Sequence, residues 1–258
     1  MATGVTPRHS FRSPTDLGKW VQILLGTSAG LSVVTAIVSY GWVRHTRFVI
    51  TIGRDIRPTF PGPTFPGLYP RPIGALAALL GLATELTWLF WQHRVTRNVW
   101  ARGRPIKTSP GWAVGWWFIP VANLWMPAVA VYRVLRASVG RRYRGGAWLI
   151  SAWWSAYILF TLLLPGVFLA TMVRPWFRAI DALSRNPNAV VSVDLTSAIH
   201  EFASWAPVVA LLQITAAVLA IAIVARIDEA QASMEPPVPA RPDVGPVAGE
   251  SLRWITPN

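Results

Sequence analysis

Four long apolar runs, separated by basic connections, dominate the pattern of this chain. The runs cover about residues 20–42, 72–92, 147–173 and 204–225, and only the second contains a charged side chain. Each is close to the roughly 20 residues that an α-helix needs to cross a bilayer. A cleaved signal peptide is the alternative for the first run, but its apolar core is too long and no small-residue cleavage pattern follows it. The pattern therefore predicts an all-α fold, an integral membrane helical bundle with four transmembrane helices.

The polar segments complete the expected organisation. Residues 1–19 are basic and precede a membrane bundle over 20–230, and residues 231–258 are rich in proline without periodicity, which is typical of a disordered tail. The connection from Arg44 to Arg71 carries the duplicated sequence TFPG and further prolines. Proline at this density excludes regular helix and favours extended or turn conformations. This loop and the tail are expected to be exposed and are candidate contacts for protein partners.

A fifth apolar segment, SPGWAVGWWFIPVANLWMP over 109–127, contains three prolines, an asparagine and four tryptophans. Proline divides it into pieces shorter than a bilayer, and tryptophan favours the head-group boundary. From Leu124 onward, Ala128, Val131, Tyr132 and Leu135 share one helical face, as in an interfacial helix. The expectation is an interfacial or re-entrant helix over 110–139, with Asn123 satisfying freed backbone groups if the segment is re-entrant. A fifth transmembrane helix is the alternative.

The distribution of lysine and arginine distinguishes these topologies. If the segment over 109–127 does not cross, sixteen basic residues lie on one side of the membrane and eight on the other. If it crosses, the two sides carry nearly equal numbers. Because cytoplasmic segments of membrane proteins are enriched in basic residues, the first arrangement is favoured. It places the chain in the cell membrane as a multi-pass protein with both termini in the cytoplasm.

Composition narrows the chemistry. The chain is 53% hydrophobic and 14% charged, with a net charge of +13, and its arginines flank the apolar runs, where anionic membrane lipids would attract them. No nucleic-acid-binding motif accompanies this charge, so no nucleic acid is expected. The chain has no cysteine and its four histidines are far apart, so no metal site is expected. No phosphate-binding, dinucleotide or hydrolase motif is present, and no cofactor is expected.

Glu85 is the most informative single residue, because a carboxyl group inside an apolar helix is expensive and usually faces the bundle interior. Helical spacing places it on one stripe with Trp88, Gln92 and Thr96. One interpretation pairs Glu85 with a cytoplasmic-edge arginine, Arg94, Arg133 or Arg136. The other makes it a functional acid in a cavity, with aromatic side chains available to line that cavity: Trp88, Trp91, Trp153, Trp154 and Tyr157.

Two motifs resemble those of an uncharacterised family of actinobacterial multi-span integral membrane proteins, a domain of unknown function. One is W-x-x-R-x-x-x-N, and the other is the proline- and tryptophan-rich signature that follows it. The last helix of that family ends in a basic segment closed by glutamine, which VARIDEAQ at 224–231 resembles. The resemblance implies a membrane bundle and supplies no catalytic residues. The matching positions are Trp91, Arg94, Asn98, Pro110, Gly111, Trp112, Trp117, Phe118, Pro120, Asn123, Leu124 and Pro127.

Two function classes follow from these observations. The first is a non-enzymatic scaffold, sensor or accessory subunit that contacts lipids or protein partners, which fits the basic charge and the absence of catalytic motifs. The second is a small membrane enzyme acting on a lipid or isoprenoid, such as an acid-initiated terpene cyclase. In that case Glu85 would supply the proton, and aromatic faces would stabilise cationic intermediates.

Overall fold

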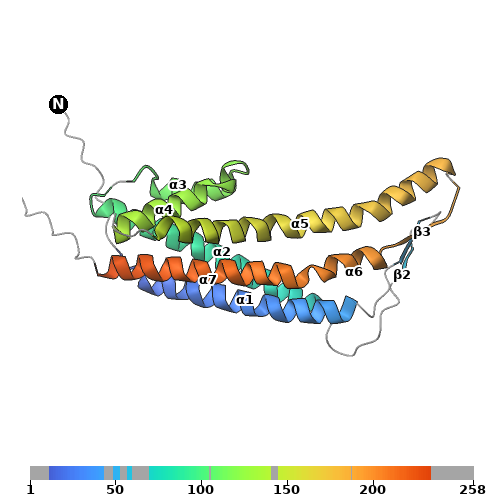
Figure 1. The fold of residues 1–258 in the computed structure, drawn as a ribbon, viewed down its shortest axis with the longest axis horizontal. Coiled ribbons are helices and arrows are strands. Elements are labelled where there is room, and N and C mark those ends of the chain that lie inside the picture. Colours follow the sequence, from blue (N-terminus) through green and yellow to red (C-terminus); the bar gives the residue numbers. More distant parts are fainter. Residues whose placement is uncertain are drawn as a thin grey trace, which may run out of the picture.

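The computed structural model describes residues 12–43, 49–52, 57–59, 70–104, 106–140, 145–186 and 188–233. Four long helices run side by side along the longest axis of the molecule (Figure 1). Each contains a stretch that is long and apolar enough to cross a membrane, which confirms the expected all-α membrane bundle. The helices are α1 (Thr15–Val43), α2 (Pro70–Ala101), α5 (Gly146–Arg185) and α7 (Ala206–Ala232), with the short α6 (Thr196–Ser204) leading into α7.

The order of packing leaves the bundle least closed between α2 and α5. Helix α1 packs against both α2 and α7, and α7 packs in turn against α5. Helices α2 and α5 approach each other at the rings of Trp88 and Trp153, whose centroids are 5.3 Å apart. Large side chains that face outward, such as Leu79 and Leu211, are mostly exposed. This exposure fits a lipid surround, where an apolar surface gains little by leaving hydrocarbon.

The Trp-rich segment forms a helical hairpin, which we define as residues 109–140. It consists of α3 (Pro110–Gly115), two 3₁₀ turns (Trp116–Phe118 and Ala122–Leu124) and α4 (Met126–Val139). Ser109 starts α3 by accepting the Trp112 backbone N–H at 3.3 Å, and Pro110 occupies the first turn, where its missing N–H has no consequence.

Both ends of the hairpin lie at one end of the bundle, and its tip points along the bundle. At the base, Arg133 of α4 donates to Thr108 Oγ1 at 2.7 Å, just before α3 begins. At the tip, Trp154 Nε1 donates to the Leu124 carbonyl at 2.7 Å, eight residues into α5. Eight residues correspond to about 12 Å of helix. The segment therefore enters and leaves on the same side, as expected from the charge distribution, and no fifth spanning helix is found among the described residues.

The opposite end of the bundle carries a small antiparallel sheet that the sequence analysis did not anticipate. Its strands are β1 (Val49–Ile52), β2 (Arg57–Thr59) and β3 (Val191–Asp194), in the order β2-β1-β3. Extended backbone was expected in the proline-rich connection, but its pairing with β3 joins segments far apart in sequence. Most of the TFPG duplication lies outside the described residues. We call this the sheet end of the bundle and the other the hairpin end.

Helices α5 and α7 continue beyond the ends that the apolar runs predict. Helix α5 has 40 residues, about 60 Å at 1.5 Å per residue, and includes Pro165 and Pro175. Figure 1 shows it curving toward the sheet end, as expected for a helix with internal proline. Helix α7 reaches Ala232, so residues 231 and 232 are helical, and the rest of the expected tail from 234 lies outside the described residues.

Candidate functional site

A long apolar crevice runs through the part of the bundle where α1, α2, α5 and α7 meet. It consists of two adjoining cavities of about 450 and 300 Å³. The larger lies toward the sheet end, bounded in part by Val43 and Phe202, and the smaller lies toward the hairpin end, next to the tryptophans. The two cavities adjoin, since the same side chains line both: Ser28, Ala77, Gly81, Phe160 and Gln213.

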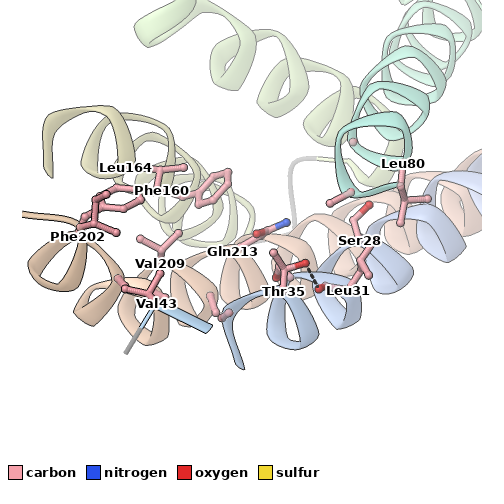
Figure 2. A pocket seen from close by; sticks show the side chains of 18 residues that line it. Ser28, Leu31, Thr35, Val43, Leu80, Phe160, Leu164, Phe202, Val209 and Gln213 are labelled. Carbon is pink, nitrogen blue, oxygen red and sulfur yellow. Dashed lines mark hydrogen bonds between the residues drawn. The ribbon is translucent and has the colours of Figure 1, made fainter. Parts of the chain in front are cut away.

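Small side chains create the larger cavity. Helices α1, α2 and α7 present alanine, glycine and serine to it, while leucine, valine and phenylalanine form its outer walls (Figure 2). The hydroxyl groups of Ser32 and Thr35 donate to carbonyls of their own helix, each at 2.9 Å. Since these donors are already satisfied, the walls of this cavity offer mainly van der Waals contact.

The polar groups of the crevice gather near the junction of the two cavities. Ser28 and Thr84 share a hydrogen bond of 3.0 Å, and Thr84 also donates to the Leu80 carbonyl at 2.7 Å. Gln213 extends its amide from α7 toward the centre of the cavity in Figure 2. Neither Gln213 nor Glu85 makes a hydrogen bond or ion pair with a residue that the structure describes. Two polar side chains therefore face the crevice with unused hydrogen-bonding capacity.

The expected ion pair of Glu85 with a cytoplasmic-edge arginine is wrong for the described part of the chain. Arg94 Nη1 donates instead to the Ser13 carbonyl at 3.3 Å, and Arg133 is engaged by Thr108. The physical reason is distance along the helix: Arg94 lies nine residues beyond Glu85, about 13 Å closer to the hairpin end. Glu85 faces the smaller cavity, whereas these arginines belong to the end of the bundle.

The structure brings together three of the five aromatic candidates and adds a fourth. Trp88, Trp153 and Tyr157 line the smaller cavity together with Glu85, as proposed from the sequence. Trp117, from the hairpin, also lines it, with its ring centroid 5.8 Å from that of Tyr157. Trp117 was noted only as a signature residue, because its approach to α5 depends on how the hairpin folds back.

Trp91 and Trp154 do not line the crevice. Trp91 is fully buried and donates to Asp228 Oδ1 at 2.9 Å, and Trp154 holds the hairpin tip through the Leu124 carbonyl. Trp91 lies about one helical turn beyond Trp88 toward the hairpin end. There its indole meets Asp228 of α7 instead of the cavity. These two tryptophans therefore have structural roles.

Gln92 fastens the hairpin to α2 directly beside the crevice. Its Oε1 accepts the indole N–H groups of Trp117 at 2.8 Å and Trp88 at 3.2 Å. Its Nε2 is buried and has no hydrogen-bond partner among the described residues. The predicted inward stripe is thus confirmed for Trp88, Gln92 and Thr96, which are all buried, but not for Glu85, which borders the cavity and is exposed. This arrangement fixes two of the four rings that line the smaller cavity.

A polar network at the hairpin end joins the motif residues of the sequence resemblance. Asn98 Nδ2 donates to Gln231 Oε1 at 2.9 Å and to the Arg12 carbonyl at 2.8 Å, while Asn98 Oδ1 accepts the Arg12 N–H at 3.2 Å. Gln231 Nε2 donates to the Val95 carbonyl at 3.1 Å and to Ser138 Oγ at 3.0 Å. The network therefore ties the start of α1 to α2, α4 and α7.

Arg102 closes this network, donating from Nη2 to the Gln231 carbonyl at 2.7 Å. Burial, together with the nearby Arg104 charge, lowers the pKa of Arg102 from its ordinary value. The group nonetheless remains a cation at neutral pH, since an arginine starts so high. Asn98, Gln231 and Arg102 all bond to other parts of the chain, so we assign the network a structural role.

The remaining signature residues build the hairpin. Phe118 and Leu124 are exposed near the tip, as expected for side chains in contact with lipid. The expectation that Asn123 satisfies freed backbone groups is wrong for its side-chain oxygen, which is buried without a partner among the described residues. The backbone N–H of Asn123 instead donates to the Ile119 carbonyl at 2.7 Å, so the tip closes through its own main chain. Within the described residues, no group of three or more metal-ligating side chains comes together.

Comparison with known proteins gives one match. A family model described as a domain of unknown function (DUF4328) matches residues 70–229, which is more than half of the chain. These residues include α2, the hairpin, α5 and most of α7, so they hold most of the walls of the crevice. No curated protein and no solved structure matches the chain.

Proposed function

The chain belongs to this DUF4328 family, and from that premise we propose that it is a non-enzymatic membrane protein that binds an amphiphilic lipid or isoprenoid in the crevice, as a sensor would. The observation that carries the proposal is that two polar side chains without partners among the described residues, Glu85 and Gln213, face two adjoining apolar cavities. We retain from the sequence the proposals that the chain comes from an actinobacterium and that its two motifs mark the family.

The dimensions of the crevice suit one apolar chain. Cavities of roughly 300 to 1,000 Å³ with mostly apolar walls and a few polar groups are typical of small-molecule sites. The larger cavity, at about 450 Å³, lies within that range and adjoins the smaller one. An isoprenoid or acyl chain in the larger cavity would bury its length against leucine, valine and phenylalanine, and its polar end would reach the junction.

Glu85 and Gln213 specify the chemistry of that polar end. Within the protein Glu85 is exposed and Gln213 is half-buried, but both lie in helices that would cross the membrane, where water is scarce. An unpartnered polar group in such surroundings costs on the order of 1 to 3 kcal/mol, so a ligand that supplies the missing hydrogen bonds recovers this free energy. A hydroxyl group can donate to one of these side chains and accept from the other. We therefore propose a ligand with a long apolar chain and a hydroxyl or similarly small hydrogen-bonding group.

Gly81 is the position at which to fill the crevice, because it lines both cavities and a Cβ atom built there meets no other heavy atom within 4 Å. Gly81→Leu should therefore fill the junction. Gly74→Leu is the matched control, since it changes another glycine of α2 with equally open surroundings away from the crevice.

The test is to purify each variant in mild detergent and to identify co-purifying amphiphiles by mass spectrometry of the extracted lipid. The expected result is one amphiphile class enriched with the unaltered protein and with Gly74→Leu, but reduced at least tenfold with Gly81→Leu. Equal recovery from all three proteins would overturn the proposal.

One specific observation favours the enzyme as a second candidate. Four aromatic rings, those of Trp88, Trp117, Trp153 and Tyr157, line the same cavity as the unpaired Glu85 carboxyl group. Such faces can stabilise a carbocation formed when an acid protonates an alkene. Glu85→Gln separates the two functions: it keeps the shape and the hydrogen-bonding capacity, so ligand recovery should persist. Conversion of an added isoprenoid to a cyclised product by the unaltered protein alone, and not by Glu85→Gln, would instead establish the enzyme.

We propose further that the hairpin end faces the cytoplasm, following the excess of basic residues on that side. Arg12 and Gln231 both reach Asn98, so the described beginning and end of the chain lie at this same end. Reporters active only outside the cytoplasm should give a signal when fused at 62 and 190, and none at 105, 143 and 258. Opposite locations for 105 and 143 would contradict this orientation.

We also propose that the proline-rich loop and the tail contact other proteins; both lie largely outside the described residues.

A further inference from the structure

A second site lies at the hairpin end, on the outer face of α4. It is a groove of about 870 Å³ between α4 and the segment that leads into the hairpin. Four cationic side chains line it, Arg104, Lys107, Arg133 and Arg136, and no acidic side chain of the described residues does. We call it the basic groove. It shares no lining residue with the crevice, so it is a separate site.

Two of its cations are held in place by the protein. Arg133 Nη1 donates to Thr108 Oγ1 at 2.7 Å, and Arg104 Nη1 donates to the Ala137 carbonyl at 3.2 Å. The Thr108 carbonyl in turn accepts the Trp100 indole N–H at 3.1 Å. A guanidinium has five N–H donors, so one such bond orients each group and leaves donors for an anion. Two cations of the basic groove are therefore oriented by the protein and keep free donors for an anion. An excess of cations on one side of a membrane protein does not by itself require such ordering.

An apolar groove of about 420 Å³ adjoins it between α4 and α5. The two grooves share Val129 and Tyr132, which stand on the same face of α4 as Arg133 and Arg136 because they are spaced by three and four residues. The apolar groove extends to Trp154 and Ser155, which lie about 12 Å along α5 from its start. Moving from one groove to the other thus leads from the end of the bundle toward its middle.

We propose that the two grooves together bind an anionic glycerophospholipid, with its phosphate among the four cations and one acyl chain between α4 and α5. The change from charged to apolar walls matches the change from head group to chain along such a lipid. Its direction also matches, because the cations lie at the end of the bundle and the apolar groove leads inward. A soluble phosphate compound would use only the basic groove and leave the adjoining apolar one unexplained.

Native mass spectrometry of the purified full chain in detergent tests this proposal. The probes are phosphatidylglycerol, phosphatidylcholine with the same acyl chains, and glycerol 3-phosphate as the soluble head group. The unaltered protein should bind phosphatidylglycerol at least tenfold more tightly than either other probe. Equal binding of both lipids, or binding of glycerol 3-phosphate as tight as that of phosphatidylglycerol, would overturn the proposal.

Variants locate the two parts of the site. Lys107 and Arg136 are exposed, so the double variant Lys107→Gln/Arg136→Gln should keep the fold. It should weaken phosphatidylglycerol binding by about tenfold or more and leave phosphatidylcholine unchanged, since each cation near an anionic lipid contributes about one decade or slightly less. The matched control is Lys19→Gln/Arg178→Gln, which removes two exposed cations outside the groove and should have little effect.

The acyl-chain groove has its own variant. Ser151 and Ser155 are exposed in that groove, so Ser151→Phe/Ser155→Phe should fill it. This change should weaken phosphatidylglycerol binding several-fold without changing any binding of glycerol 3-phosphate. Unaltered phosphatidylglycerol binding by this variant would show that the chain lies elsewhere and would refute the site as proposed. None of these changes touches the crevice, and Gly81→Leu does not touch the grooves, so the two proposals can fail separately.

Discussion

Replacing Asn98 by alanine tests whether the network at the hairpin end holds the bundle together. The side chain makes three hydrogen bonds, two to the backbone of Arg12 and one to Gln231. A hydrogen bond contributes about 1 kcal/mol net in soluble proteins and about 0.6 kcal/mol on average between transmembrane helices. The loss of three bonds should therefore destabilise the protein by about 2 to 3 kcal/mol, since it also leaves the buried Gln231 Oε1 without its donor.

Unfolding in mixed micelles of increasing SDS fraction, followed by fluorescence of the 15 tryptophans, measures this change in the free energy of unfolding. Asn188→Ala is the matched control, because Asn188 is an exposed asparagine beyond the end of α5 whose side chain makes no hydrogen bond with a described residue, and it should change stability by less than about 0.5 kcal/mol. The double variant Asn98→Ala/Gln231→Ala should show a coupling energy of about 1 kcal/mol, since the two residues share a bond. If Asn98→Ala unfolded like Asn188→Ala, the network would not stabilise the bundle and the reasoning would be refuted.

Two further substitutions test other contacts by the same unfolding measurement. Gly18→Ala should destabilise the protein by about 1 to 3 kcal/mol, because a Cβ atom on α1 would overlap the Asp228 carboxyl group of α7 and force it to move. Unchanged stability would contradict the close approach of these helices. Trp117→Phe should cost about 1 kcal/mol, since it keeps an aromatic ring in place but removes the N–H that Gln92 accepts, whereas Trp112→Phe, at an exposed position, should cost less.

Much of the membrane architecture could be predicted because it depends on local properties of the sequence. Apolar runs of sufficient length mark the four spans, and helical spacing placed Trp88, Gln92 and Thr96 on the buried face of α2. Proline and tryptophan in the segment over 109–127, with the charges on either side, indicated a segment that does not cross. The ends of α5 and α7 were less predictable, since a helix can leave the bilayer and continue with arginine and proline in its sequence.

The partners of the polar side chains could not be predicted in the same way. The sequence identified Glu85 as a carboxyl group inside an apolar helix. Whether it pairs with an arginine depended on a distance that only the assembled helices reveal. The sequence likewise noted Asn98 and a closing glutamine without indicating that they share a hydrogen bond across 133 positions. The small sheet was missed because strands of three or four residues carry little local signal and gain their stability from pairing.

The sequence by itself therefore determined which segments are long and apolar enough to span and which residues of α2 are buried, because hydrophobicity and helical period act at each position along the chain. Only the tertiary structure decided that Trp117 joins Trp88, Trp153 and Tyr157 around Glu85, and that two grooves meet along α4. These features depend on how far apart the packed helices stand and on where small residues leave space. The distance between two packed helices depends on many side-chain contacts between segments that are distant in sequence, so it cannot be predicted from any one segment.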